Sequence, residues 1–186
     1  QMCFSDRPDT EAIAVAKGNL GMVYMARGDL DQAETMLKQS LALHKKLAYK
    51  EGVAGPYGNL GLIYQARGDL IQAETMLNNS LALYESLGNK EGMAINYGNL
   101  GLIYRTRGDL GLAEAMHLQS LAIEEELGRK EGVAGAYSNL ALVYETRGDL
   151  DLAEEMLKQS LAINEGLGRK EGMAIQYNNL GLIYRI

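Results

Sequence analysis

The sequence predicts an all-α protein built as a stack of repeated helix pairs, and two observations lead to this prediction. First, the segment from Tyr97 to Tyr104 recurs with small changes every 40 residues, and a fixed period of this size is the signature of a stacked array. One asparagine marks the register of the five copies: Asn19, Asn59, Asn99, Asn139 and Asn179. Second, each period carries two apolar stripes with helical spacing, and the chain has only two prolines, which would interrupt helices.

The composition limits the classes of partner. The chain is 47% hydrophobic and 23% charged, a balance typical of globular domains. A net charge of -6 argues against nucleic acid, which binds basic surfaces. No apolar run is long enough for a membrane span, and no signal peptide is evident. The single cysteine, Cys3, forms no intrachain disulfide, so we expect a cytoplasmic protein, and the first residue, Gln1, suggests a piece of a longer chain.

The period also divides the chain into segments. We expect residues 1–8 to form an irregular lead-in that ends at Pro8, and Asp9 to cap the first helix. The repeat array then occupies residues 9–186. Its units are about 9–48, 49–88, 89–128 and 129–168, and a final first helix occupies 169–186.

Each unit is expected to contain two helices, here called A and B, and the unit 49–88 illustrates the pattern. The stripe of helix A consists of Val53, Tyr57, Leu60, Gly61 and Tyr64. The stripe of helix B consists of Leu70, Ala73, Leu77, Leu81 and Tyr84. Gly68 and Gly88 are expected to end the two helices in the left-handed conformation, and Asp69 to cap helix B.

The same junction explains a triplet, Arg-Gly-Asp, that could be taken for a cell-adhesion motif. It occurs four times, beginning at Arg27, Arg67, Arg107 and Arg147. We interpret it as structural, because arginine suits the negative end of a helix, glycine ends that helix and aspartate begins the next.

Two glycine series lie inside the A helices, where each glycine costs about 1 kcal/mol relative to alanine. The first series is Gly21, Gly61, Gly101 and Gly181, and the second is Gly52, Gly92, Gly132 and Gly172. We expect the first to admit helix B of the same repeat and the second to admit helix B of the preceding repeat.

The pattern Tyr57-x2-Leu60-Gly61-x2-Tyr64, followed by Ala73-x3-Leu77, resembles the tetratricopeptide repeat. Tyrosine replaces the usual tryptophan, leucine replaces phenylalanine, and the period is 40 instead of 34, as in kinesin light chain and the Pins/LGN adaptors. HEAT and armadillo arrays share the period but lack this Leu-Gly-x2-Tyr…Ala sequence pattern. The resemblance implies a right-handed α-solenoid of antiparallel helix pairs, about four and a half repeats long.

A helical wheel divides helix A of the third unit into two sides. The stripe residues take one side, and the other holds Ile95, Gly98, Asn99, Leu102, Arg105 and Thr106. The resemblance implies that this second side lines a concave groove and that the repeated asparagine contacts a bound peptide. An amide suits a peptide group, because each offers a donor and an acceptor. Alternatively, the asparagines could bond a neighbouring helix and fix the angle between repeats.

Other residues of the expected groove are Leu62, Leu102 and Leu142, which form an apolar line, and Arg105, whose position varies between repeats. These leucines could instead be partly buried against neighbouring repeats, and Arg105 could be a solvated surface residue. His44 and His117 lie in helix B of two repeats without a nearby metal-ligating or catalytic partner, so we expect them at the surface. We therefore expect no enzymatic activity, no metal site and no cofactor.

The last helix, residues 171–185, is not more polar than its equivalents. Tyr177, Leu180 and Tyr184 would meet a B helix beyond the end of the chain, so this helix offers a possible homo-oligomer contact.

The function predicted is that of a scaffold or adaptor that binds a protein or peptide in extended conformation. A self-assembly module and a peptide-sensing regulatory domain of a larger signalling protein are the alternatives.

Overall fold

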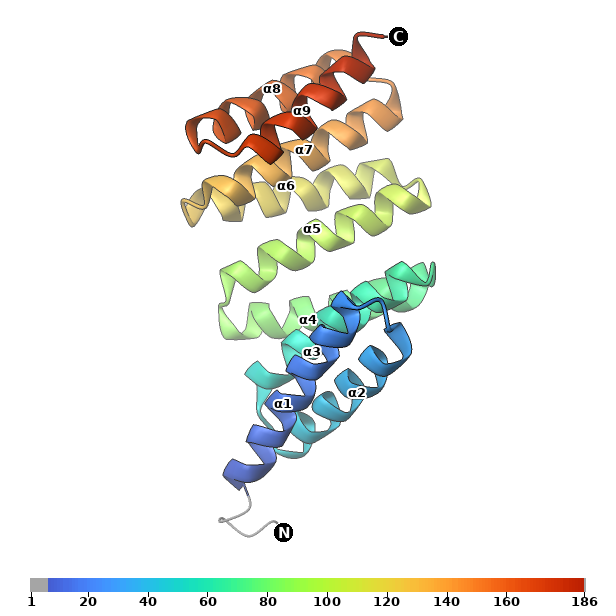
Figure 1. The fold of residues 1–186 in the computed structure, drawn as a ribbon, viewed down its shortest axis with the longest axis vertical. Helices are drawn as coiled ribbons and strands as arrows, with labels where there is room; N and C mark the ends of the chain where they lie inside the picture. The colour runs from blue at the N-terminus through green and yellow to red at the C-terminus, as the bar shows by residue number, and fades with distance from the viewer. Residues whose placement is uncertain (1–6, 186) are drawn as a thin grey trace. The chain divides into compact units, whose positions relative to one another are not determined.

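The computed structural model of the chain describes residues 7–185, so Cys3 lies outside the described residues. Over that range it contains nine α-helices and no strand, divided between two compact units, residues 1–89 and 90–186 (Figure 1). The first unit holds α1 (Arg7–Ala26), α2 (Leu30–Lys46), α3 (Lys50–Ala66) and α4 (Leu70–Leu87). The second holds α5 (Lys90–Arg107), α6 (Leu110–Glu126), α7 (Lys130–Arg147), α8 (Leu150–Gly166) and α9 (Lys170–Ile183).

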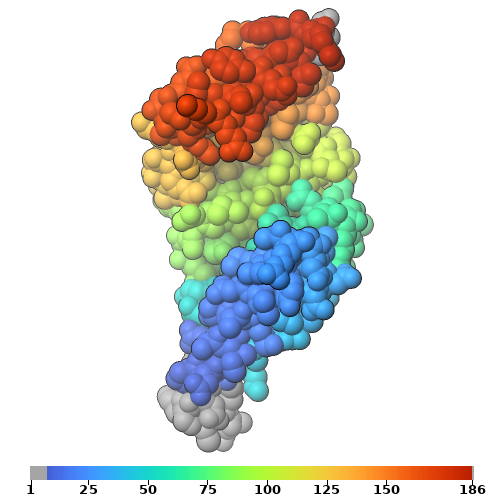
Figure 2. All heavy atoms as spheres, in the orientation of Figure 1, coloured from blue at the N-terminus to red at the C-terminus, as the bar shows by residue number. Residues whose placement is uncertain are grey.

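The odd-numbered helices are the predicted A helices and the even-numbered ones the predicted B helices. Each A helix packs against the B helix that follows it, and each B helix packs against the next A helix of the same unit. In the second unit the helices follow one another in chain order from yellow-green α5 to red α9 (Figure 1). Figure 2 shows the side chains of this unit as successive bands of colour.

The start of the first helix differs from the prediction. Helix α1 begins at Arg7, so Pro8 and Asp9 belong to its first turn and Asp9 is not its cap. Both residues suit that place, because proline lacks the N–H that a first turn leaves unpaired and a carboxylate faces the positive end of the helix.

The predicted left-handed helix ends are confirmed. The glycines of the A-to-B junctions have φ between 78° and 89°, at Gly28, Gly68, Gly108 and Gly148. The B-to-A junctions use Gly88, Gly128 and Gly168 with φ of 65–66°. The equivalent residue after α2 is Ala48, which adopts φ 54° and is the one non-glycine residue with positive φ among those described.

The predicted aspartate caps are confirmed in the first unit and wrong in the second. Asp29 and Asp69 accept hydrogen bonds from the backbone N–H groups of Gln32 and Gln72, at 3.1 and 3.0 Å. Asp109 makes no such bond, and neither does Asp149. In the second unit these carboxylates instead accept hydrogen bonds from Arg107 Nε and Arg147 Nε, two residues earlier.

Most glycines of the two series inside the A helices have the packing role that was predicted, but the prediction is wrong for Gly181, where a Cβ atom would meet no heavy atom within 4 Å. A Cβ atom placed on Gly21 or on Gly61 would lie 2.7 Å from Cγ of Leu37 or Leu77, on helix B of the same repeat. In the second series, Gly52, Gly132 and Gly172 lie directly against His44, Glu124 and Asn164 of the preceding B helix.

A buried serine joins the two helices of every full repeat. The hydroxyl donates to a backbone carbonyl of helix A, 26 residues earlier, at 2.7–2.9 Å. The pairs are Ser40 with Ala14, Ser80 with Ala54, Ser120 with Ala94, and Ser160 with Ala134. The signal for this link in the sequence is the serine at the same position of each B helix.

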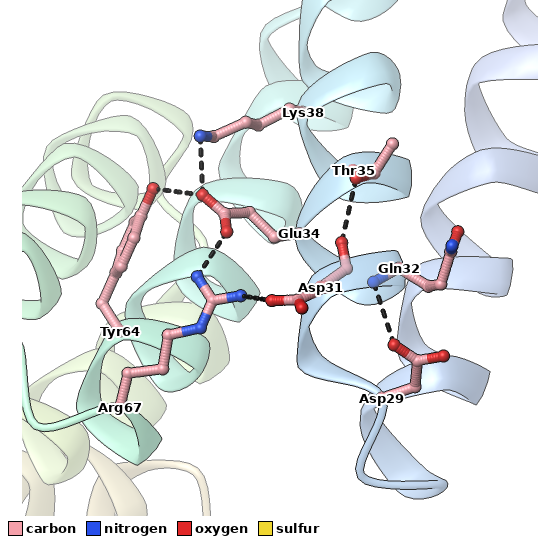
Figure 3. A network of polar contacts seen from close by, with 8 residues as sticks. All are labelled: Asp29, Asp31, Gln32, Glu34, Thr35, Lys38, Tyr64 and Arg67. Atoms are coloured by element: carbon pink, nitrogen blue, oxygen red, sulfur yellow. Dashed lines mark hydrogen bonds and ion pairs between the residues drawn. The ribbon is translucent and has the colours of Figure 1, made fainter.

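A polar cluster joins the two repeats of the first unit (Figure 3). Tyr64 of α3 donates a hydrogen bond to Glu34 of α2 at 2.8 Å, Lys38 lies 2.6 Å from the same carboxylate, and Arg67 pairs with it. Arg67 also reaches Asp31 at 2.5 Å. Lys38, followed by Arg67 and Tyr64, outweighs the effect of burial and lowers the pKa of Glu34 to about 2. The arginine of the Arg-Gly-Asp triplet at Arg67 therefore has a structural role.

Candidate functional site

The repeated asparagines occupy the same position of α1, α3, α5, α7 and α9. Asn19 is exposed, and Asn59, Asn99, Asn139 and Asn179 are partly exposed. Each immediately precedes a leucine, and in the last four helices this leucine is buried, so the amide lies about 100° around the helix from the core. Within the described part of the chain, none of these five amides forms a hydrogen bond, either with a neighbouring helix or with its own.

Three of these asparagines belong to the second unit, where the A helices lie in series. The ion pair between Glu91 and Arg129, at 2.5 Å, joins the start of α5 to the turn before α7. Glu131 and Arg169, at 3.5 Å, do the same for α7 and α9. We call the outward side of these helices the A-helix face. Its residues are Ile95, Asn99, Leu102, Arg105, Gly135, Asn139, Leu142, Ile175, Asn179 and Leu182.

A hollow of about 340 Å³ opens between α7 and α9 on this face, above α8. Asn139 and Gly135 belong to its wall on α7, and Ile175 and Gln176 to its wall on α9. Gln176 is buried and lies 3.4 Å from the hydroxyl of Ser138, which also lines the hollow. The remaining lining residues are Glu131, Ala134, Ser160, Asn164, Arg169, Glu171 and Gly172.

The leucines expected to line the groove are half-buried. Leu62, Leu102 and Leu142 have this intermediate exposure, whereas Leu182 at the end of the series is exposed. Arg105 is also half-buried, and its Nε has no hydrogen-bond partner among residues 7–185. These side chains combine apolar surface with some access to solvent.

The first unit carries Asn19, Asn59 and Leu62 on its own A helices, α1 and α3. A hollow of about 510 Å³ lies along α1, between Pro8 and Asn19. Its other lining residues, Glu11, Ala12, Val15 and Ala16, come from the same helix, so this hollow is a shallow open surface.

Both histidines are buried, so the expectation that they lie at the surface is wrong. His117 is 0% exposed and His44 is 3% exposed. His117 occupies the position that Leu37, Leu77 and Leu157 hold in the other repeats, directly against Gly101. This 40-residue spacing was visible in the sequence and identifies the position as part of the core.

Neither ring nitrogen of His117 has a hydrogen-bond partner among the described residues. Burial, with the nearby positive charge of Arg105, lowers the pKa of His117 to about 4, and burial also lowers the pKa of His44. His117 is therefore neutral at pH 7 and belongs to the core, not to a site that reaches solvent.

One residue of α9 does not match the expectation that three of its side chains would pack on a further B helix. Leu180 is only 7% exposed and packs with Leu157 and Tyr144, so it is buried without such a helix. Tyr177 and Tyr184 are 53% and 62% exposed, although their hydroxyls donate to Glu165 and Glu154 of α8 at 3.1 and 2.7 Å.

The described residues contain no group of three or more histidine, cysteine, aspartate or glutamate side chains placed to hold a metal ion. Over the same range, no helix combines the length and the apolar character that crossing a membrane requires.

Solved structures share this arrangement of helices. BtubC (BKLC) from P. vanneervenii matches 98% of this chain and 76% of its own, with a TM-score of 0.85 and 23% identity. A Podosopora anserina protein described as a kinesin light chain with nearly identical TPR-like repeats matches 95% of this chain and 87% of its own, with a TM-score of 0.77 and 22% identity. Aspartyl phosphate phosphatase F from Bacillus subtilis matches 93% of this chain but 45% of its own, with a TM-score of 0.88 and 14% identity. At these identities the likeness concerns the fold alone.

A search of the curated proteins finds none that matches the chain. A family model described as tetratricopeptide repeat, in contrast, matches residues 12–64, 52–126 and 132–186. Proteins built from this repeat generally act as non-catalytic scaffolds for interactions between proteins. The helix pairs, the 40-residue register and this match together confirm the predicted all-α solenoid, and the chain belongs to the tetratricopeptide repeat family.

Proposed function

We propose that this chain is a non-enzymatic scaffold that binds an extended segment of another protein along its A helices. The asparagine amides are the groups that hold the backbone of this segment. One observation carries the proposal: five equivalent amides reach solvent, and none is used for a hydrogen bond within the described residues. It counts against the alternative in which these asparagines fix the angle between repeats.

The scale of the helices supports an extended ligand. Neighbouring helices pack about 8–10 Å apart, and an extended chain rises about 3.3 Å per residue, so one amide would meet about every third peptide residue. A hydrogen bond of this kind contributes about 1 kcal/mol. Asn99, Asn139 and Asn179 of the second unit together would then strengthen binding on the order of a hundredfold.

The other residues of the proposed site have supporting roles. Within each unit separately, Leu62 of the first and Leu102 and Leu142 of the second supply apolar contact to side chains of a bound segment, and Arg105 of the second unit supplies a charge for selectivity. The scaffold requires no cofactor, and we place its partner in the cytoplasm together with it.

The test begins with a displayed library of random dodecapeptides, selected on the 186-residue chain. Binding of the selected peptides is then measured by fluorescence anisotropy. The double variant Asn99→Ala with Asn139→Ala should weaken binding about 10- to 30-fold, while Asn78→Ala, on the exposed surface of α4, should leave it unchanged. A library that yields no binder, or binders indifferent to the double variant, would contradict the proposal.

A second candidate is self-association through the C-terminal helix, residues 171–185, and the exposed tyrosines of α9 favour it. Tyr177→Ser with Tyr184→Ser should then lower the mass measured by light scattering. A monomer mass that does not change with concentration would rule this candidate out.

A further inference from the structure

Gly135, in the first half of α7, is a glycine that the packing of the fold does not require. At Gly61, by contrast, a Cβ atom would lie 2.7 Å from Leu77, and this close approach explains the missing side chain. A Cβ placed on Gly135 would meet no heavy atom within 4 Å, and Gly135 is exposed on a helix without positive φ. Glycine weakens a helix relative to alanine, and no close neighbour excludes a side chain at Gly135. The glycine at this position therefore needs an explanation other than helix packing.

The neighbouring A helices show what Gly135 leaves open. The equivalent residues are Ile95 on α5 and Ile175 on α9, which are 49% and 50% exposed. At Gly135 the A-helix face therefore lacks the apolar side chain that the two neighbouring A helices expose at the same position. The hollow of about 340 Å³ between α7 and α9 has Gly135 in one wall and Ile175 in the other.

The lining of the hollow is largely polar, with some apolar surface and three charged side chains. Ala134 and Ile175 line its sides, and Glu131, Glu171 and Arg169 also line it. Arg169 lies 3.5 Å from Glu131 and offsets that charge. Glu171 forms no ion pair with any residue that the structure describes, so one negative charge stays uncompensated.

A lysine or arginine side chain matches this combination, because its methylene stem packs on apolar surface while its charged end pairs with carboxylates. An anionic side chain would meet the uncompensated carboxylate, and a purely apolar one would leave that carboxylate without a partner. Asn139 lines the same hollow, so the amide that would hold the backbone lies beside the space for the side chain.

We infer that the hollow at Gly135 receives one lysine or arginine side chain of the bound segment, with its stem on Ile175 and its charge at Glu171 and Glu131. This inference rests on the proposed function and adds the selectivity of the site. Gly135 is the residue that determines this selectivity, because a larger side chain there would fill the hollow.

The peptides selected on the unmodified chain provide the test. They should share one basic residue, and replacing it by norleucine should weaken binding about tenfold, as expected for a charge-assisted contact. Glu171→Gln should weaken binding of the basic peptide to a similar extent and leave the norleucine peptide unaffected. Gly135→Ile should abolish the preference for the basic residue, and the matched change Gly55→Ile, at the equivalent position of α3, should not.

A thermal melt separates loss of the hollow from loss of the fold. Gly135→Ala should melt at a higher temperature than the unmodified chain, because the added methyl group meets open space. If Gly135→Ile does not fold, Glu171→Gln and the norleucine peptide decide the question.

The outcomes distinguish the inference from the proposed function. Peptides that depend on Asn99 and Asn139 but carry no shared basic residue, or bind the norleucine form equally well, would overturn the inference alone. A library without any binder would overturn both.

Discussion

Replacing His117 by leucine should stabilise the protein, and more so in acid. His117 is fully buried, and neither ring nitrogen has a partner among the described residues. The other three full repeats carry leucine at this position, and Leu37 and Leu77 each pack against a glycine as His117 does. At pH 7, His117→Leu should therefore increase the free energy of unfolding by about 1–3 kcal/mol, the usual penalty of an unpaired buried polar group.

The pH dependence follows from the pKa of His117, which is lowered from 6.5 to about 4 in the folded chain. The contribution of neutral His117 to stability is fully present above pH 6.5 and is lost as the pH falls to about 4, because the unfolded chain takes up the proton first. The gap between the two pKa values corresponds to about 3 kcal/mol in total and about 2 kcal/mol by pH 5. The advantage of leucine over histidine should therefore grow by about 2 kcal/mol between pH 7 and pH 5.

The measurement is urea unfolding of both proteins, followed by circular dichroism at pH 7, 6 and 5. Carboxylates and His44 titrate in both, so the difference between the two proteins isolates His117. Leu77→His is the reciprocal variant: it places histidine against Gly61 and should create a similar loss in acid. A difference between the unmodified chain and His117→Leu that is the same at pH 7 and pH 5 would refute the reasoning.

Three further predictions concern backbone and capping positions, and urea unfolding at pH 7 checks each of them. Ala48→Gly should stabilise the chain by about 0.5–1 kcal/mol, because Ala48 adopts φ 54°, where a side chain is strained; a loss of stability would contradict this. Pro56→Ala should stabilise α3 by about 1–3 kcal/mol, because Pro56 lies inside that helix without an N–H to donate, and an unchanged midpoint would count against it. Asp69→Ala should destabilise by about 1 kcal/mol through loss of its cap, whereas Asp109→Ala loses only a surface ion pair of about 0.5 kcal/mol or less; equal effects would show that the two aspartates do not differ in this way.

The helices could be predicted from the sequence because their ends and their packing depend on local features that recur. Gly68 ends α3 in the left-handed conformation because glycine alone enters it without strain. The apolar stripe that contains Leu60 and Leu77 follows from helical spacing. Forty-residue repetition made each of these features visible several times.

Departures from the prediction arise where a neighbouring residue competes for the same group. The side chain of Asp109 does not cap α6, because its carboxylate accepts a hydrogen bond from Arg107 Nε, whereas in the first unit Arg67 pairs with both Asp31 and Glu34. The lack of a metal-ligating or catalytic partner in the sequence led to the prediction of a surface position for His117, yet its repeat position belongs to the core. The position within the repeat decides, because the equivalent residues Leu37, Leu77 and Leu157 are buried as well.

The candidate site could be predicted only in its repeated part. Asn99 and Asn139 recur, so their common position on the A helices follows from the period. The hollow beside Gly135 depends on the absence of a side chain between two helices that are adjacent only in the folded chain, so the period alone does not predict it.

The links between helices have a consequence for how such a protein can change in length. Buried serines bond carbonyls 26 residues earlier, and tyrosines bond glutamates 30 residues earlier, as in Ser160 with Ala134 and Tyr144 with Glu114. Both separations are shorter than one period of 40 residues. A tandem duplication of one period therefore supplies every donor together with its acceptor, so a gene of this kind can gain or lose a repeat by recombination in register without leaving a buried polar group unpaired.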